Sequence, residues 1–307
     1  MTTASLLRTV VALGAVGLLA LTGCSGGAAP VGGAAPSAPL SLLDRAPVAS
    51  EAEIAASPTA AAIRERGQLL IGGELDLPLM SQRNPITGET VGFDATLGKL
   101  LAKYLIGEPN LKVVRSISET REAVLQTGTV DAVISTYTIT PERARKISFA
   151  GPYLVSGQAI ATLSTENRIS SPADLAGKKV VAVSGTTSVD AIKRSAPGVQ
   201  LSTFGAATEC IQALEAGSAV AYVHDMTLLA GTAQLNDKIQ IVSEPFTDES
   251  YGIGIRHGDE SFKEFVNDWL VKIQQSGLWG ENWTETLGQV VPGDPPKPPP
   301  IGSVPGS

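Results

Sequence analysis

Two stretches of the chain share one pattern, and this repeat constrains the fold most. Residues 124–136 and 213–225 each run from a helical end through a glycine, Gly128 or Gly217, into a short apolar segment that ends in polar residues. A glycine there suits a left-handed helix C-cap, and the apolar segment suits a buried strand. Any helix–glycine–strand unit has this pattern, but its recurrence predicts two similar lobes.

Strand and helix patterns alternate through the rest of the chain. Apolar segments at 69–71, 130–134, 179–183 and 219–223 alternate with helical patterns such as 97–105. This alternation predicts an α/β fold of βαβ units with mostly parallel sheets. Open α/β sheets bind ligands at the carboxyl ends of their strands, which is where both repeats place polar residues.

The beginning of the chain indicates export. Arg8 precedes an apolar run at 10–21 that is too short for a typical membrane-spanning helix and is typical of a signal peptide. The segment ending in Cys24 resembles the lipobox of bacterial lipoproteins. We therefore expect a lipoprotein signal peptide at 1–23 and a lipidated Cys24 that anchors the protein to the extracytoplasmic face of the membrane. The alternative is an ordinary signal peptide with a chance cysteine.

Composition limits the remaining possibilities. Residues 24–55 are expected to form a flexible tether, and the Pro-rich residues 291–307 a disordered tail. The net charge is −7 and no basic patch stands out, which argues against a nucleic-acid partner. Two histidines and one thiol besides Cys24, that of Cys210, make a zinc site unfavourable. We expect no metal and no cofactor, since phosphate-binding and hydrolase motifs are absent from the sequence.

A polar segment, residues 135–143, follows the first repeated strand. Thr140 suits a helix N-cap and Pro141 the first helical position, which places Arg143 in the first turn. Anions are favoured at a helix start, and a guanidinium adds a bidentate fork that matches a carboxylate. The alternative is a surface arginine like its neighbour Arg145.

The second lobe offers the opposite charge. Residues 184–188 combine a glycine with hydroxyl groups at a helix start, which suits an anion, although a capped loop has the same appearance. Asp225 ends the second repeated strand, and its carboxylate suits an ammonium group or, alternatively, an N-cap for the following helix. A guanidinium, a carboxylate and hydroxyls together suit a zwitterion.

Several segments resemble the polar amino-acid-binding proteins of bacterial ABC importers. The resemblance extends over residues 63–287 and includes the actinobacterial glutamate-, aspartate- and glutamine-binding lipoproteins. It is carried by residues 92–94, 135–143, 147–153, 185–187, 244–248 and 251–254.

The resemblance implies a periplasmic-binding-protein type II fold with two Rossmann-like lobes joined by a two-strand hinge. Residues 56–155 and 249–290 would form lobe 1, and residues 156–248 lobe 2. The chain would cross between them near 154–158 and 247–251.

The resemblance also implies roles for individual residues. Arg143 would hold the α-carboxylate of the ligand and Asp225 its α-ammonium group. Four threonines would complete the hydrogen bonds: Thr136, Thr138, Thr186 and Thr187.

Three further residues are candidates for contact with the ligand side chain. Arg83 would pair with a second carboxylate, or else be a loop arginine in solvent. His224 would bond an amide or carboxylate, or else be a partly buried structural histidine. Glu74 matches an acidic pocket residue of some relatives, or else ends a surface strand.

The sequence departs from the family pattern at three places, of which Val220-Ala221, in place of the usual Asp-Ala, affects only packing. Leu77 stands where many relatives place an aromatic ring, so stacking on the ligand is in doubt. Val181 stands where actinobacterial relatives carry a second cysteine, so Cys210 is expected to be a free, buried thiol.

The implied function is that of a monomeric substrate-binding lipoprotein with an ABC permease as partner. Its ligand would be an acidic or polar L-amino acid, glutamate or aspartate first and glutamine or asparagine next. One alternative is a lipoprotein that presents the ligand to a membrane receptor. Another is a dehydratase on the same fold, although an enzyme is not expected.

Overall fold

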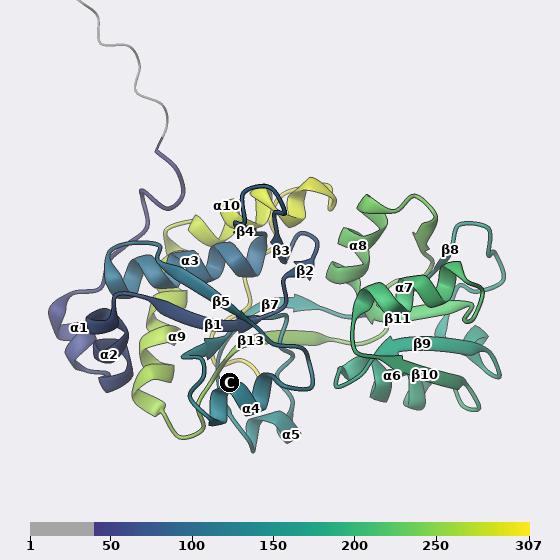
Figure 1. Ribbon diagram of the computed structural model, residues 1–307, viewed down its shortest axis with the longest axis horizontal. Coiled ribbons are helices and arrows are strands. Elements are labelled where there is room, and N and C mark those ends of the chain that lie inside the picture. Colours follow the sequence, from purple (N-terminus) through teal and green to yellow (C-terminus); the bar gives the residue numbers. More distant parts are fainter. Residues whose placement is uncertain (1–39) are drawn as a thin grey trace, which may run out of the picture. The chain divides into compact units, whose positions relative to one another are not determined.

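The computed structural model describes residues 40–307. The predicted signal peptide and Cys24 lie outside the described residues. Two five-stranded sheets form the framework of residues 40–307 (Figure 1). The first has the order β5 (Leu111–Arg115), β1 (Leu69–Gly73), β6 (Ala132–Val133), β13 (Glu249–Ile255), β7 (Ser148–Ser156). The second has the order β10 (Gln200–Phe204), β9 (Lys179–Val183), β11 (Ala221–Asp225), β8 (Gln158–Leu163), β12 (Ile239–Ile241).

The two sheets have the same pairing pattern. In each, the first two pairings are parallel and the last two antiparallel. The expectation of mostly parallel sheets is therefore wrong, because β8 and β13, next to the crossings between sheets, run against their neighbours. The repeated glycines do adopt the left-handed conformation, with φ of 68° at both Gly128 and Gly217. Each repeat thus ends one helix and starts the central strand of its own sheet.

The chain crosses between the sheets twice. β7 ends at Ser156 and β8 begins at Gln158, so the first crossing is at Gly157; the second falls between β12 and β13. Residues 158–241 thus build the second sheet, and we call the units around the first and second sheets lobe 1 and lobe 2.

Helices cover both faces of the sheet in lobe 1. One face packs against α2 (Pro58–Arg66), α3 (Phe93–Ile106), α9 (Glu260–Gln275) and α10 (Leu278–Glu285), through a core that contains Trp269 and Trp279. Below the other face lie α4 (Arg121–Gln126) and α5 (Pro141–Ala144), packed through Tyr137 and Phe149. A small hairpin sheet comprises β2 (Asp76–Leu77), β3 (Ser81–Arg83) and β4 (Thr90–Val91), and η2 (Leu287–Gln289) follows α10.

Lobe 2 also packs helices against both faces of its sheet. On β9, Val181 and Val183 face the side of α7 (Ala207–Glu215) and α8 (Met226–Leu235), whereas Val180 and Ala182 face the side of α6 (Thr187–Ser195) and η1 (Pro172–Leu175). This two-residue alternation is that of a strand buried on both faces. Cys210 lies in α7 as a buried free thiol, as predicted.

Both expected flexible segments differ from expectation where the structure describes them. The expected tether, 24–55, includes α1 (Glu51–Ala55), and the side chains of Leu42 and Ile54 are buried in the core of lobe 1. The expected disordered tail packs on the same lobe, with Ile301 against its core. In both segments a few apolar side chains find partners, which the Gly-, Ala- and Pro-rich composition obscures.

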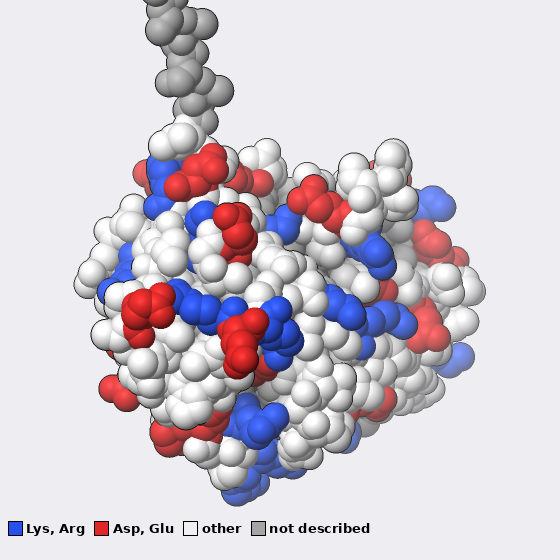
Figure 2. Space-filling model, turned by 60° about the vertical axis from the view of Figure 1, so that its left-hand side comes forward, with Lys and Arg blue, Asp and Glu red and all other residues white. Residues whose placement is uncertain are grey.

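The described surface mixes charges of both signs. On the face shown in Figure 2, blue and red side chains alternate over lobe 1 and do not gather by sign. Exposed ion pairs such as Lys99–Glu89 at 3.0 Å contribute to this pattern, and such pairs stabilise little. No helix within residues 40–307 has the length and apolar character needed to cross a bilayer.

Candidate functional site

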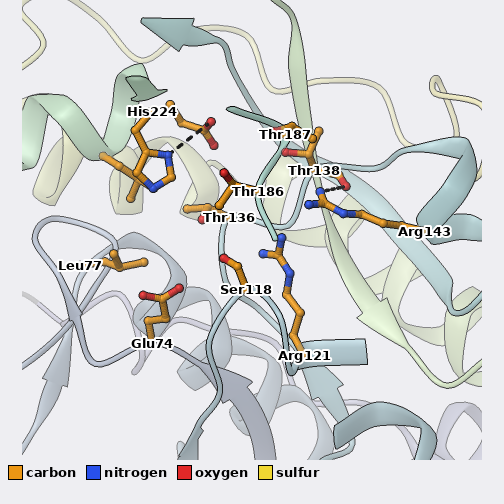
Figure 3. Close-up of a pocket in the computed structure, with 12 residues that line it drawn as sticks. Glu74, Leu77, Ser118, Arg121, Thr136, Thr138, Arg143, Thr186, Thr187 and His224 are labelled. Atoms are coloured by element: carbon orange, nitrogen blue, oxygen red, sulfur yellow. Dashed lines mark hydrogen bonds and ion pairs between the residues drawn. The ribbon is translucent and has the colours of Figure 1, made fainter. Parts of the chain in front are cut away.

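A polar cavity lies where the two lobes meet. Its lining comes from segments that follow β1, β5, β6 and β9, from the carboxyl end of β11, and from β2 and α8. The lining residues are Glu74, Leu77, Ser118, Arg121, Thr136, Thr138, Arg143, Thr186, Thr187, His224, Asp225 and Leu228 (Figure 3). The free volume is about 10 Å³, room for about one water molecule. A wider groove of about 750 Å³ shares five of these residues with the cavity.

Arg143 is held in the cavity by the local sequence that precedes it. Thr140 caps α5 by accepting a hydrogen bond from the Arg143 amide at 3.2 Å, and Pro141 occupies the first turn. The residue is 9% exposed. Its Nη1 donates to the Thr138 carbonyl at 2.8 Å, and its Nη2 donates to the Gly185 carbonyl at 3.0 Å. The second bond joins the two lobes.

Arg121 is a second buried arginine, which the sequence analysis missed. It is 4% exposed and begins α4. Its guanidinium lies 3.8 Å from the centre of the Tyr137 ring, and Nη1 donates to the Ser135 carbonyl at 3.2 Å. Nε has no partner among the described residues. Burial, with the nearby charge of Arg143, lowers the pKa of Arg121 to about 10, so it remains a cation at neutral pH.

Asp225 supplies the opposite charge from lobe 2. It precedes α8 as predicted, but its side chain makes no capping bond; instead Gln158 Nε2 donates to Oδ1 and Tyr251 Oη donates to Oδ2 at 2.5 Å. His224 Nδ1 is 3.8 Å from Oδ1, beyond hydrogen-bond range. Burial alone would raise the pKa of Asp225, but His224, Tyr251 and Gln158 outweigh it and hold the pKa below its usual value.

The threonines of lobe 2 have already committed their hydroxyl protons. Thr187 Oγ1 donates to Glu249 Oε2 at 3.0 Å and accepts from Gln158 Nε2 at 3.2 Å, while Thr186 Oγ1 donates to the Val183 carbonyl at 2.6 Å. Neither side chain caps α6, so the first-turn amides of that helix have no side-chain acceptor. This end of the cavity therefore offers backbone N–H groups, which favour an anion.

The loop that carries Thr136 is held in place by hydrogen bonds to the buried Asp94. Thr136 has a φ of 43°, and its amide donates to Asp94 Oδ2 at 2.8 Å, while Tyr153 Oη donates to Oδ1 at 2.9 Å. Asp94 is fully buried, and burial raises its pKa to about 7 despite these two bonds. Asp94 belongs to a motif noted in the sequence, and its visible role is to hold the threonine loop.

The three candidates for side-chain contact separate into two groups. Glu74 and His224 line the cavity and are 8% and 6% exposed; burial and the charge of Asp76 raise the pKa of Glu74. Arg83 does not line it. It is exposed on β3, and its Nε donates to the Gly88 carbonyl at 3.2 Å, because the hairpin turns the side chain away.

Comparison with known proteins adds the family. The sequence pattern of bacterial extracellular solute-binding proteins, family 3, matches residues 69–285. The ABC transporter glutamine-binding protein GlnH of Bacillus subtilis (strain 168) is 34% identical over 225 residues, which cover 73% of this chain and 82% of that protein. The glutamate-binding protein GluB of Corynebacterium efficiens is 32% identical over 237 residues, covering 73% and 80%.

A solved structure agrees. The ancestral amino acid-binding protein described as a precursor of cyclohexadienyl dehydratase matches with a TM-score of 0.68 and 34% identity, covering 74% of this chain and 99% of that one. The two-lobe α/β fold is that of type II periplasmic binding proteins. The chain belongs to the bacterial extracellular solute-binding proteins of family 3.

Proposed function

We propose that the protein binds an acidic or polar L-amino acid between its lobes and delivers it to the permease of an ABC importer. Glutamate and aspartate are the preferred ligands, followed by glutamine and asparagine. The observation that carries the proposal is that the cavity is lined by a cation from lobe 1, Arg143, and an anion from lobe 2, Asp225. Each is buried, and only a ligand with both charges satisfies both.

The α-carboxylate would bind Arg143 and the uncapped amides of α6. Arg143 donates to carbonyls of both lobes, and these neutral acceptors are weaker partners than a carboxylate. The α-ammonium group would bind Asp225, whose lowered pKa keeps it ionised. Thr187 would contribute a hydroxyl lone pair, since its proton is committed to Glu249.

Arg121 supports a preference for an acidic side chain. It is a desolvated cation whose Nε has no partner among the described residues, in the same cavity as Arg143. A dicarboxylate would give each arginine one carboxylate, with Asp225 taking the ammonium group. A side-chain amide would satisfy the hydrogen bonds of Arg121 but not its charge, which is why glutamine and asparagine rank second.

Binding requires the lobes to separate and close again. A cavity of about 10 Å³ does not admit an amino acid, so ligand must enter when the Arg143–Gly185 bond is broken and the groove is open. Closure then excludes water around both ligand charges. A ligand favours the closed state by the difference between its affinities for the closed and open states.

We propose binding rather than catalysis, although the fold is shared with a protein described as a dehydratase precursor. The relatives named above are called binding proteins. Incubation with prephenate and arogenate tests this point, and we expect no turnover. More moles of product than of protein would show that the chain is an enzyme.

We also propose that lipidated Cys24 tethers the protein to the cell membrane. The apolar run and small residues before Cys24 support this. Labelling cells with an alkyne fatty acid should modify the unaltered chain and not Cys24→Ala, which should be released to the medium. An unlabelled parent chain would refute the anchor without affecting the binding site.

A thermal-shift panel of the twenty L-amino acids tests the ligand. A ligand that binds only the folded state raises Tm by mass action. We expect the largest rises with glutamate and aspartate, smaller rises with glutamine and asparagine, and none with arginine or lysine, whose added cation meets two arginines. A panel led by a basic or an apolar amino acid would overturn the proposed specificity.

A further inference from the structure

Residues 291–307 follow the family match, which ends at residue 285, and cross lobe 1 in a fixed order of contacts. A Cβ at Gly280 of α10 would lie 3.8 Å from the Pro295 ring. Gln274, at the end of α9, donates from Nε2 to the Pro299 carbonyl at 3.3 Å. The Gly302 amide then donates to the Gly151 carbonyl at 2.8 Å. Since β7 is the edge strand of its sheet, the segment covers an otherwise open edge.

The end of this segment reaches the peptide that carries Arg143. Val304 packs with the cluster that contains Tyr137 and Ile139. A Cβ at Gly306 would lie 2.8 Å from Ala144 Cβ and 3.6 Å from Ile139 Cγ2. In Figure 1 the C-terminal end of the ribbon lies beside α4 and α5. Residues 304–306 thus contact positions on both sides of Arg143.

The Arg143 peptide has little regular structure of its own. α5 is four residues long, and so short a helix is marginal without tertiary contacts. Its sheet support is one isolated bridge, Thr138 to Tyr251, made by bonds from the Ile139 amide to the Ser250 carbonyl at 2.8 Å and from the Gly252 amide to the Tyr137 carbonyl at 2.9 Å. Ile139 and Ala144 pack with the cluster that contains Ile147 and Phe149, and the tail adds contacts with both residues.

We propose that residues 291–307 are a positioning strap, which holds the peptide 138–144 so that the Arg143 guanidinium points into the cavity. Its proline content reduces the entropy lost when such a strap becomes ordered. The strap contacts Ile139 and Ala144 of this peptide, and Val304 packs against the cluster that contains Tyr137, whose ring also contacts Arg121. Loss of the strap should weaken binding by loosening both arginines.

The effect on affinity rests on the proposed function, but the effect on backbone order does not. The test is hydrogen–deuterium exchange of the unliganded full-length chain with three single substitutions. Val304→Asp places a charge against the apolar cluster. Gly306→Val adds a Cβ toward Ala144 at a φ of 97°. Ser303→Asp is the matched control, since Ser303 is exposed.

We expect Val304→Asp and Gly306→Val to lower protection of residues 138–147 by at least about tenfold, with β9 and α7 of lobe 2 unchanged. Ser303→Asp should behave like the parent chain. Unchanged protection of residues 138–147 in both disrupted variants would overturn the strap. This holds even if Tm falls, because a tail that only stabilises the fold would lower Tm without loosening this peptide.

Calorimetry with the ligand found in the amino-acid panel gives the second measurement. We expect affinity to fall roughly two- to thirtyfold in both disrupted variants, the range for mutations that act through an intervening element. Affinity equal to that of the parent chain would contradict the positioning role. If the parent chain binds no amino acid, the proposed function fails, while the exchange result still decides the strap.

Discussion

Lobe 1 and lobe 2 share a strand order but differ in what they bury. The largest fully buried side chains all belong to lobe 1 except Tyr222, and all three tryptophans lie on α9 and α10. Lobe 2 is packed mainly with alanine, valine, isoleucine and leucine on its two faces. The lobe with the heavier aromatic core also carries both buried arginines, which rest on Tyr137.

This difference suggests a division of labour. Burying two like charges requires a rigid, well-packed support, because each must keep its partners in fixed positions. Lobe 2 contributes one carboxylate and the start of α6 to the site. A smaller packed core is enough to support these groups. Asp225 is even held from the hinge strands, by Gln158 on β8 and Tyr251 on β13. We therefore expect lobe 1 to stay fixed and lobe 2 to move when the lobes open and close around the ligand.

The largest expected loss of ligand affinity comes from a substitution in lobe 1. Arg143→Met should weaken amino-acid binding by about 2–5 kcal/mol, because it leaves the ligand carboxylate without its charged partner in a closed site. Arg145→Met is the matched control, since Arg145 is exposed two residues away and should bind as the parent does. Calorimetry that gave equal affinities for the two variants would remove Arg143 from the site.

A substitution of Asp225 tests the contribution of lobe 2 to ligand binding. Asp225→Asn should weaken binding by about 2–3 kcal/mol, less than Arg143→Met, since the amide oxygen still accepts from Tyr251 or from the ligand. Asp237→Asn, an exposed change in the same lobe, should leave affinity unaltered. Retained tight binding by Asp225→Asn would mean that the ammonium group is held elsewhere.

Arg121 should decide which ligand is preferred. Arg121→Gln should lower the affinity for glutamate by about 1.5–3 kcal/mol, the range for hydrogen bonds to charged groups, while changing the affinity for glutamine much less. Arg115→Gln on the exposed side of β5 serves as control. Equal losses for both ligands would indicate that Arg121 supports the fold and does not recognise the side chain.

The raised pKa of Asp94 predicts that the folding stability of lobe 1 depends on pH. Its pKa is raised from 3.8 to about 7 in the folded chain, so the folded state keeps a proton that the unfolded state releases in this range. The stability contributed by this group therefore falls as pH rises from about 4 to 7. Asp94→Asn cannot lose the proton, and Asn can still pair with Thr136 and Tyr153.

Relative to the parent chain, the Tm of Asp94→Asn should therefore improve by roughly 3 °C or more between about pH 5 and about pH 8. Differential scanning calorimetry at both values gives the answer. A constant difference between the two proteins would show that Asp94 does not titrate on unfolding in this range.

Cys210 should give the smallest effect and reports on lobe 2. Burial raises the pKa of this thiol to about 12, so almost none of it is the reactive thiolate at neutral pH. Maleimide labelling of the native protein at about pH 7.5 should be slower than in denaturant by at least about a hundredfold. Rapid labelling of the native chain would mean that lobe 2 opens far more often than a packed domain does.

The sequence predicted the site best where local chemistry defined it. Thr140 and Pro141 located the start of α5, and so the place of Arg143, because capping is a local property. Gly128 and Gly217 marked both helix ends for the same reason. Arg121 was missed because its neighbours make an ordinary amphipathic pattern. Its position just after the carboxyl end of β5 was the available signal.

Other features depend on contacts between distant segments. The bonds from Gln158 and Tyr251 to Asp225 join residues that are 67 and 26 positions apart, and no local pattern indicates them. Arg83 was placed in the site by resemblance, but the hairpin geometry of β3 turns it toward Gly88. The Pro-rich tail was expected to be disordered because composition does not reveal that Ile301 and Val304 have apolar surfaces to cover.

The most direct test alters the ligand and leaves the protein unchanged. Calorimetry would compare L-glutamate with N-acetyl-L-glutamate, which lacks the ammonium charge, and with the α-amide of glutamate, which lacks the α-carboxylate charge. We predict that each blocked analogue loses at least about a hundredfold in affinity, since each leaves one buried charge without a partner. Binding of either analogue as tight as that of glutamate would contradict the claim that Arg143 and Asp225 together grip a free amino acid.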